Sequence, residues 1–376
     1  MQAHSFSVEQ KNLNLVLAAM QPICNRRTPL DATGAIYFLA RHKELIIKST
    51  DLEISLQYSC PIENSSLTGD CAFLLAGKRI FDLVKELDGL INFTLEANQV
   101  VIQAGSARLA LNLRELQDFP PFPERIENLL PFESRMLLTM LEKVAFVIPQ
   151  NNPNPALNGL LIELAPTGLK MTATDGHCLA QVQSAACCLD TSISWLLPRR
   201  AVFELKKLVE TAGDGLIFVG TCDKQLVFSG TSFNFFSKLL VDSFPEYRPI
   251  LAKEGFQRAA IKRTDFMKTL KRSACLLSGQ FIAAKFDFHA DELNVLMNNK
   301  EVGTLQETLR LSEPGISDLA IRFYAPYILN GLQAFEQSDL AFYLKNKAQP
   351  IIFEAQQDEL LFTYLTMPVS PEATAN

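Results

Sequence analysis

The sequence contains few of the residues that carry enzymatic or metal chemistry. Its 376 residues include only four histidines and one tryptophan. The eight cysteines form no Cys-x-x-Cys pair and have no pair of histidines nearby, so a zinc site is not predicted. We expect reduced cysteines that are mostly small buried side chains. They are Cys24, Cys60, Cys71, Cys178, Cys187, Cys188, Cys222 and Cys275.

Four enzyme motifs are also missing from the chain. We find no Gly-x-Gly-x-x-Gly, no phosphate-binding Gly-Lys-Ser/Thr loop, no Gly-x-Ser-x-Gly and no His-Glu-x-x-His. One catalytic hypothesis remains, which uses Asp175, His177 and Cys178. However, Thr-Asp-Gly-His is typical of a tight turn between strands, and no nucleophile with a plausible base accompanies it. We therefore expect no enzyme activity, no cofactor and no metal.

Long apolar segments are absent as well. No stretch approaches the roughly 18 uncharged residues that a membrane span needs. The first residues lack the basic and then apolar run of a signal peptide. We expect a cytoplasmic protein with no membrane partner.

Two series of predicted helices divide the chain into three similar parts. Apolar spacing predicts helices at 7–20, 133–147 and 262–277, and a second series at 77–87, 198–210 and 325–335. Both series repeat with a period of about 125 residues. The proline-containing segment 119–126 and the polar segment 251–257 are candidate linkers. We predict domains at 1–126, 127–254 and 255–376, the last with a short C-terminal tail.

Short alternating segments between the helices predict roughly eight antiparallel strands in each part. Two helices packed on such sheets give an α+β fold. We expect three domains in a row to form an arc with the helices on its inner wall. This curvature is a hypothesis, because sequence periodicity does not determine it.

Basic residues recur on the polar sides of these helices, although the chain carries a formal net charge of -6. Each helix alone is also consistent with an ordinary solvated surface. The recurrence favours a local positive surface for a polyanion. The residues are Lys78, Arg79 and Lys85, then Arg199, Arg200, Lys206 and Lys207, and finally Lys268, Lys271 and Arg272.

Several segments resemble the bacterial sliding clamp family, the beta subunit of DNA polymerase III. Residues 172–180 are similar to its Ala-Thr-Asp-Gly-His-Arg-Leu-Ala segment, and residues 157–161, 244–250 and 364–369 agree in order and spacing. Residues 50–53 and 198–200 are also similar. The resemblance implies a three-domain arc that pairs head to tail with a second copy as a homodimer. The six-domain ring would encircle double-stranded DNA without regard to sequence and tether the replicative DNA polymerase, the clamp loader and repair polymerases.

The resemblance also implies an apolar cleft between the second and third domains, which binds short partner peptides with leucine and phenylalanine anchors. The matching positions are Leu157, Thr174, Gly176, His177, Leu179, Pro245, Ile250, Leu365, Met367 and Pro368. Plain core packing is the alternative for the three leucines. Arg26, in the loop 25–27, loosely matches a DNA-facing loop of the family, and a solvated turn is its alternative.

The chain departs from the family at several positions. Cys178 stands where the family has arginine, Pro249 stands where a second basic residue is common, and Thr366 replaces an aliphatic residue. The tail after Val369 is longer than usual. We expect peptides that rely on that arginine to bind less well. An interaction scaffold that keeps the fold but does not encircle DNA is the alternative function.

Overall fold

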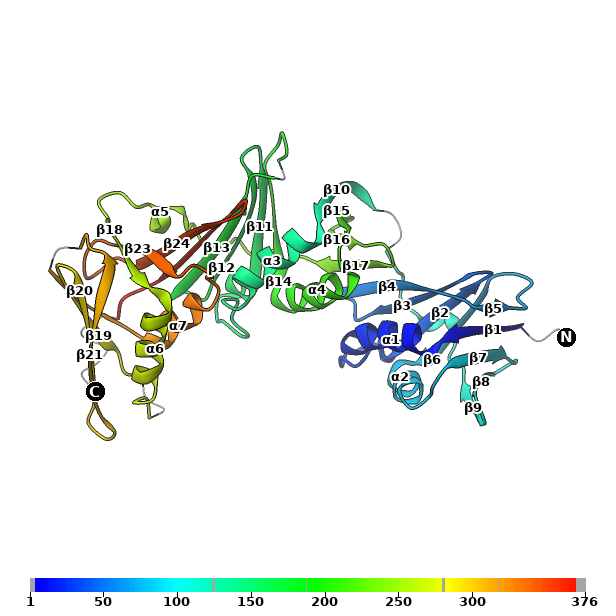
Figure 1. Ribbon diagram of the computed structural model, residues 1–376. Coiled ribbons are helices and arrows are strands. Elements are labelled where there is room, and N and C mark those ends of the chain that lie inside the picture. The colour runs from blue at the N-terminus through cyan, green and yellow to red at the C-terminus, as the bar shows by residue number, and fades with distance from the viewer. Residues whose placement is uncertain (1–3, 124–125, 187, 279–280, 317, 370–376) are drawn as a thin grey trace. The chain divides into compact units, whose positions relative to one another are not determined.

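The computed structural model describes residues 4–123, 126–186, 188–278, 281–316 and 318–369 (Figure 1). Cys187 and the tail after Val369, both considered above, lie outside these residues. One order of elements occurs three times: a strand, a helix, a group of strands, a second helix and three more strands. The prediction of an α+β fold with three repeats is confirmed.

The first repeat contains β1 (His4–Glu9), α1 (Gln10–Cys24), β2 (Ala35–Arg41), β3 (Glu44–Thr50), β4 (Ile54–Pro61), β5 (Asn64–Ser65), β6 (Cys71–Ala76), α2 (Gly77–Lys85), β7 (Leu90–Leu95), β8 (Gln99–Ala104) and β9 (Ala107–Asn112). The second contains β10 (Glu127–Glu133), α3 (Ser134–Ala145), β11 (Gly159–Ala165), β12 (Gly168–Thr174), β13 (Cys178–Ser184), β14 (Ile193–Pro198), α4 (Arg199–Ala212), β15 (Leu216–Cys222), β16 (Gln225–Ser229) and β17 (Phe233–Lys238).

The short helix α5 (Arg248–Leu251) precedes the third repeat. This repeat contains β18 (Gln257–Lys262), α6 (Arg263–Ala274), β19 (Ala284–His289), β20 (Glu292–Asn299), β21 (Gly303–Glu313), β22 (Leu319–Phe323), α7 (Ala325–Leu332), β23 (Asp339–Leu344), β24 (Ile351–Gln357) and β25 (Leu360–Thr366). Short 3-10 helices lie at Asp31–Gly34, Leu116–Asp118 and Pro155–Asn158.

Apart from the pairs β1–β5 and β18–β21, which occur in one repeat each, strand pairing is the same in every repeat. In the first, β1, β7, β8 and β9 lie next to one another in that order, and β6, β2, β3 and β4 form a second group. The corresponding strands of the other two repeats pair in the same way, and every pair is antiparallel. Antiparallel hairpins need only short connections, which explains how so many strands fit into each repeat.

Neighbouring repeats are joined by continuous sheets. The last strand of the second repeat, β17, pairs with β4 of the first, and Phe235 lies opposite Leu56. The last strand of the third repeat, β25, pairs with β13 of the second, and Leu365 lies opposite Leu179. We call the β4–β17 pair the first junction and the β13–β25 pair the second junction. Each extends one repeat into the next by main-chain hydrogen bonds.

The helices cover the sheets with their apolar sides. Leu13, Val16, Leu17 and Met20 of α1 are buried, at the spacing of one helical face. Helices α1 and α2 contact each other, as do α6 and α7 (Figure 1). In α4 the buried residues are Ala201, Val202, Leu205, Leu208 and Val209, as the apolar spacing predicts.

The predicted start of the first helix is wrong by three residues. Residues 7–9 belong to β1, whose partner β7 is more than eighty positions away in the chain. Strands β1, β10 and β18, each directly before a first-series helix, were not predicted. These segments form strands because they pair with strands that are distant in the sequence, and local apolar spacing does not reveal such partners.

Contacts divide the chain into two compact units. Unit 1 is Met1–Leu138 with Arg200–Leu239, and unit 2 is Thr139–Arg199 with Leu240–Asn376. Unit 1 contains the first junction and unit 2 the second. The predicted domain boundaries at 126 and 254 follow the sequence repeat and stay a prediction.

Candidate functional site

The turn between β12 and β13 is built by one aspartate. Asp175 Oδ1 accepts hydrogen bonds from the amides of His177 at 2.8 Å and Cys178 at 2.6 Å. Gly176 has a φ of 95°, where a side chain would be strained. The carbonyl oxygen of His177 accepts a hydrogen bond from the amide of Met367 at 2.8 Å. The turn and the end of β25 therefore form one rigid corner.

An apolar cluster lies beside this corner. Leu179, Tyr247, Ile352 and Leu365 are its buried members, and Ile250 and Phe244 are among the partly buried residues that pack against it. Leu157 packs near the turn, because its Cδ1 lies 3.9 Å from the position that a Cβ on Gly176 would take. The second junction brings these residues together from segments about 200 positions apart in the chain.

The ten predicted cleft residues differ in exposure. Gly176, His177 and Pro245 are exposed, and Thr174, Ile250, Met367 and Pro368 are partly buried. Leu157, Leu179 and Leu365 are buried, at 7%, 3% and 2% exposure. The three leucines lie buried beneath the corner, while the other seven residues reach the surface or its edge. The assignment of these ten residues to a cleft stays a prediction.

A line of aromatic rings continues from the corner and was missed in the sequence. The His177 ring stacks on Tyr327 with centroids 5.7 Å apart, Tyr327 meets Tyr324 edge-on at 4.9 Å, and Tyr324 stacks on Phe281 at 4.5 Å. Phe281 is 49% exposed. The signal was present in the sequence, where tyrosines precede and follow Ala325-Pro326 at the start of the second helix of the repeat. Aromatic surface of this kind binds apolar side chains well.

Burial determines the chemistry of Cys178. Its Sγ lies 3.5 Å from Thr366 Oγ1, and burial raises the pKa of the thiol to about 12, with a smaller contribution from the charge of Asp175. A thiol with this pKa is not ionised near neutral pH, so it lacks the thiolate that nucleophilic catalysis needs. The catalytic hypothesis for Asp175, His177 and Cys178 has no support from this geometry.

The other cysteines vary in exposure. Cys24, Cys60 and Cys222 are buried like Cys178, Cys71 is partly buried, and Cys188 and Cys275 are exposed. Among the described residues, no group of three His, Cys, Asp or Glu side chains is placed to hold a metal ion. The same described residues contain no helix long and apolar enough to cross a membrane.

The predicted basic residues fall into two classes. Lys78, Arg79 and Lys85 on α2, Lys207 on α4, and Lys268, Lys271 and Arg272 on α6 are exposed. Exposure does not mean an unbalanced charge, however. Arg272 Nε donates to Glu307 at 2.9 Å, which raises the pKa of the arginine, and Lys207 pairs with Glu204 at 3.1 Å.

The arginines near the first junction have structural partners. Arg200 forms an ion pair with Asp51, whose side chain is fully buried, and also donates to the carbonyl oxygen of Pro22 at 3.0 Å. Arg26 pairs with Glu53 and lies 3.6 Å from Asp51. Arg199 Nε donates to the carbonyl oxygen of Ile148 at 3.0 Å, and Lys206 is partly buried. Part of the predicted positive surface thus serves the fold.

Three family profiles match consecutive parts of the chain. The DNA polymerase III beta subunit, N-terminal domain, matches residues 4–123, the central domain matches residues 132–246, and the C-terminal domain matches residues 248–370. The chain belongs to the DNA polymerase III beta subunit family. The family is that of the beta sliding clamp, a non-catalytic processivity subunit, and the prediction of this function is confirmed.

Full-length relatives agree with this assignment. The beta sliding clamp of Pseudomonas putida is 25% identical over 97% of this chain and 99% of its own length, and that of Chlamydia pneumoniae is 27% identical over 82% of this chain and 84% of its own. A crystal structure of a DnaN sliding clamp from Pseudomonas aeruginosa bound to griselimycin has a TM-score of 0.90 at 23% identity, covering 98% of this chain and 100% of that one. The DNA polymerase sliding clamp of Bacillus subtilis also gives 0.90, at 19% identity and the same coverage.

Proposed function

We propose that two copies of this clamp subunit close head to tail into a ring around double-stranded DNA. The ring slides without reading sequence and holds the replicative polymerase, the clamp loader and repair polymerases through the cleft at the second junction. It acts in the cytoplasm, where these partners work. The observation that supports this proposal is a pair of strands. The repeat pattern assigns both strands to a junction, but the described chain does not join them to each other.

The repeat rule identifies the strands that would close the ring. At each junction the last strand of one repeat pairs with a strand of the preceding repeat, β17 with β4 and β25 with β13. Strands β4 and β13 occupy the same place in their repeats, next to β3 and β12. The remaining members of the two sets are β9 and β21. In the described chain β9 is an edge strand next to β8, and β21 uses its outer side only near its end, at Leu311 and Glu313. We infer that β9 of one copy pairs with β21 of the other.

Side chains at these two places suit each other. Leu109 on β9 is 37% exposed, an unusual position for leucine on an edge strand. Lys78 occupies the place in α2 that Arg200 occupies in α4, and Glu301 lies in the turn that corresponds to the turns of Asp51 and Asp175. Both Lys78 and Glu301 are exposed. An ion pair between copies would thus take the place of Arg200 with Asp51.

Encirclement is the physical basis of the proposed mechanism. Charge contacts with DNA alone give dissociation constants of about 10⁻⁴ to 10⁻⁶ M at physiological salt. Such binding is too weak for long retention, and the exposed Arg79, Lys85, Lys268 and Lys271 would add only loose phosphate contacts. A closed ring keeps the protein on DNA by topology and allows it to move.

The decisive experiment compares retention of the dimer on circular and linearised DNA after loading. We expect retention on the circle and rapid loss from the linear molecule. Equal loss from both would favour the scaffold alternative, which keeps the fold but not the closed ring.

The interface is tested separately by sedimentation. Leu109→Asp and Lys78→Glu should each convert the dimer to monomers, and Glu301→Lys should restore the dimer when combined with Lys78→Glu. Lys224, in the turn between β15 and β16 of the second repeat, supplies a control, because Lys224→Glu reverses a charge in a turn that belongs to neither edge strand. Dimers that withstand both single substitutions would exclude this interface.

The cleft prediction stays a proposal with a clear chemical content. The exposed side of the corner, with His177, Met367 and the ring of Tyr327, is offered to leucine and phenylalanine side chains. Two or three such anchors, at about 1.5 to 3 kcal/mol each before ordering costs, suffice for micromolar binding.

A further inference from the structure

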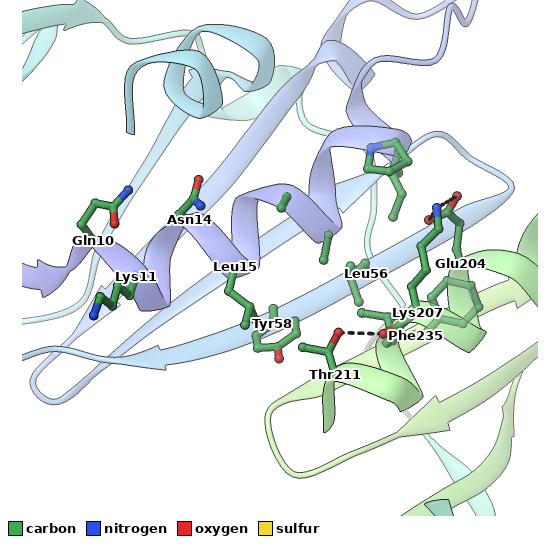
Figure 2. Close-up of a pocket in the computed structure, with 15 residues that line it drawn as sticks. Gln10, Lys11, Asn14, Leu15, Leu56, Tyr58, Glu204, Lys207, Thr211 and Phe235 are labelled. Atoms are coloured by element: carbon green, nitrogen blue, oxygen red, sulfur yellow. Dashed lines mark hydrogen bonds and ion pairs between the residues drawn. The ribbon is translucent and has the colours of Figure 1, made fainter. Parts of the chain in front are cut away.

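A pocket in unit 1 takes no part in the functions above. It lies between α1 and α4, over the first junction, with a volume of about 470 Å³. Pockets for small molecules commonly span about 300 to 1,000 Å³. Figure 2 shows Leu15 of α1 pointing toward Tyr58, with Leu56 and Phe235 also along the pocket and Lys207 and Thr211 of α4 on its far side.

Comparison of the repeats explains why no side chain fills this pocket. Helices α1 and α3 begin at Gln10 and Ser134, 124 positions apart. Ala18, Ala19 and Pro22 of the pocket therefore correspond to Glu142, Lys143 and Phe146. Three small side chains stand where the second junction has three large ones.

The second junction shows how that space is filled when the side chains are large. The ammonium group of Lys143 donates to the carbonyl oxygen of Ala334 at 2.7 Å and lies 5.5 Å from the ring centre of Phe362. The Phe146 ring stacks on Tyr364 at 6.0 Å. A long aliphatic chain and an aromatic ring thus occupy this site in the second junction.

The charges around the pocket favour an anion. Lys11 is exposed at the α1 end, and the first turn of α1 contains no acidic residue. The positive end of the helix dipole is at this turn. Glu9 occupies the N-cap position of α1 without a side-chain capping hydrogen bond and does not line the pocket. The charges of Glu204 and Lys207 balance each other at 3.1 Å. Leu15, 42% exposed, provides apolar surface next to Lys11.

We propose that this pocket binds a small amphipathic carboxylate. Its apolar chain lies along Leu15, Ala19 and Pro22 over Phe235, and its carboxylate lies at Lys11. The ligand fills the first junction as Lys143 and Phe146 fill the second, so its binding stabilises the contact of α1 with α4.

Calorimetric titration of the full-length protein with three chain-matched probes tests the chemistry. We expect decanoate to bind with a one-to-one stoichiometry, decanol about tenfold more weakly, and decylammonium weakest. Lys11→Gln should remove the preference for decanoate over decanol and leave decanol unchanged. Decylammonium binding as tightly as decanoate, or no saturable decanoate binding, would overturn the proposal.

A graft between the repeats tests the location. The variant Ala18→Glu/Ala19→Lys/Pro22→Phe places the side chains of the second junction in the first. We expect a folded protein whose decanoate affinity is at least about tenfold lower. If the graft fails to fold, the single variant Ala19→Leu takes its place in the test. It only adds apolar volume and should lower the decanoate affinity by the same factor. Unchanged decanoate affinity in a folded filling variant would place the ligand elsewhere.

Discussion

The two junctions start from the same turn and end with different surfaces. In the first, Asp51 Oδ1 accepts from the amides of Glu53 and Ile54, as Asp175 Oδ1 accepts from His177 and Cys178 in the second. Leu52 and Gly176 occupy the same place with φ of 75° and 95°. The backbone solution is shared, although only the second turn has the glycine that it favours.

The helix that faces each turn makes the difference. Arg200 of α4 reaches the buried carboxylate of Asp51, whereas α7 has Pro326 at the corresponding position and places the ring of Tyr327 on His177. The ion pair of Arg200 with Asp51 closes the corner at the first junction. The second corner keeps an aromatic, partly exposed surface. The first turn of the facing helix thus determines whether a junction has a closed, ion-paired corner or an exposed aromatic one.

Removing the cation that closes the first junction should have the largest effect. Arg200→Met leaves the buried carboxylate of Asp51 with only Arg26 nearby, at 3.6 Å. We expect the free energy of unfolding of unit 1 to fall by about 2 to 3 kcal/mol, because an uncompensated buried charge is costly. Hydrogen exchange at β4 and β17, with urea denaturation, measures this. Lys207→Met on the same helix is the control, with a change of about 0.5 kcal/mol or less. Equal effects of the two variants would show that Asp51 needs no cation.

The second junction should be sensitive to added volume and not to lost charge. A Cβ on Gly331 of α7 would lie 2.1 Å from the Tyr364 ring. Gly331→Ala should destabilise unit 2 by about 1 to 3 kcal/mol, because that ring is buried and cannot move freely. Thermal denaturation measures this effect, with Gly69→Ala as the control, because nothing lies within 4 Å of the carbon added there. A neutral Gly331→Ala would mean that α7 adjusts to the added carbon.

Removing the ring on the open corner should weaken peptide binding. Tyr327→Ala should lower the affinity for a labelled Gln-x-x-Leu-Phe peptide about tenfold, since an aromatic contact is lost. Fluorescence anisotropy measures it, with Tyr37→Ala in unit 1 as the control. An unaffected affinity would place the peptide away from α7, and the test assumes the proposed cleft.

Restoring the arginine of the family should strengthen binding by a smaller amount. Cys178 is buried next to Thr366, so the proposed cleft has no cation at this position. We expect the same peptide to bind about threefold more tightly to Cys178→Arg than to wild type. Cys178→Ser controls for loss of the thiol. Identical affinities for wild type and Cys178→Arg would remove the idea.

The smallest effect concerns pH. Burial raises the pKa of Cys178 to about 12, above its ordinary value of 9.0. The folded state therefore favours the neutral thiol, and this contribution to stability is complete below pH 9 and is lost as pH rises toward 12. Thiol labelling at neutral pH should modify Cys188 and Cys275 first and Cys178 only after unfolding. Fast labelling of Cys178 in the folded protein would contradict its burial.

The repeat and the turn could be predicted, and the pairing partners could not. Apolar spacing located six helices, and Thr-Asp-Gly-His predicted a tight turn that the Asp175 hydrogen bonds confirm. Strand β1 and the tyrosines that extend the corner were missed. Both depend on partners distant in sequence, Leu90–Leu95 for β1 and His177 for Tyr327.

By itself, the sequence determined an α+β chain of three similar parts with a clamp-family turn, because periodicity and turn chemistry act over a few residues. Only the tertiary structure decided that Arg200 closes one junction, that Tyr327 lines the other, and that Ala18 and Ala19 leave a pocket where Lys143 and its neighbours fill the equivalent site. The physical reason is that charge balance, ring stacking and empty volume depend on which distant segments are in contact. Strand pairing between repeats determines those contacts.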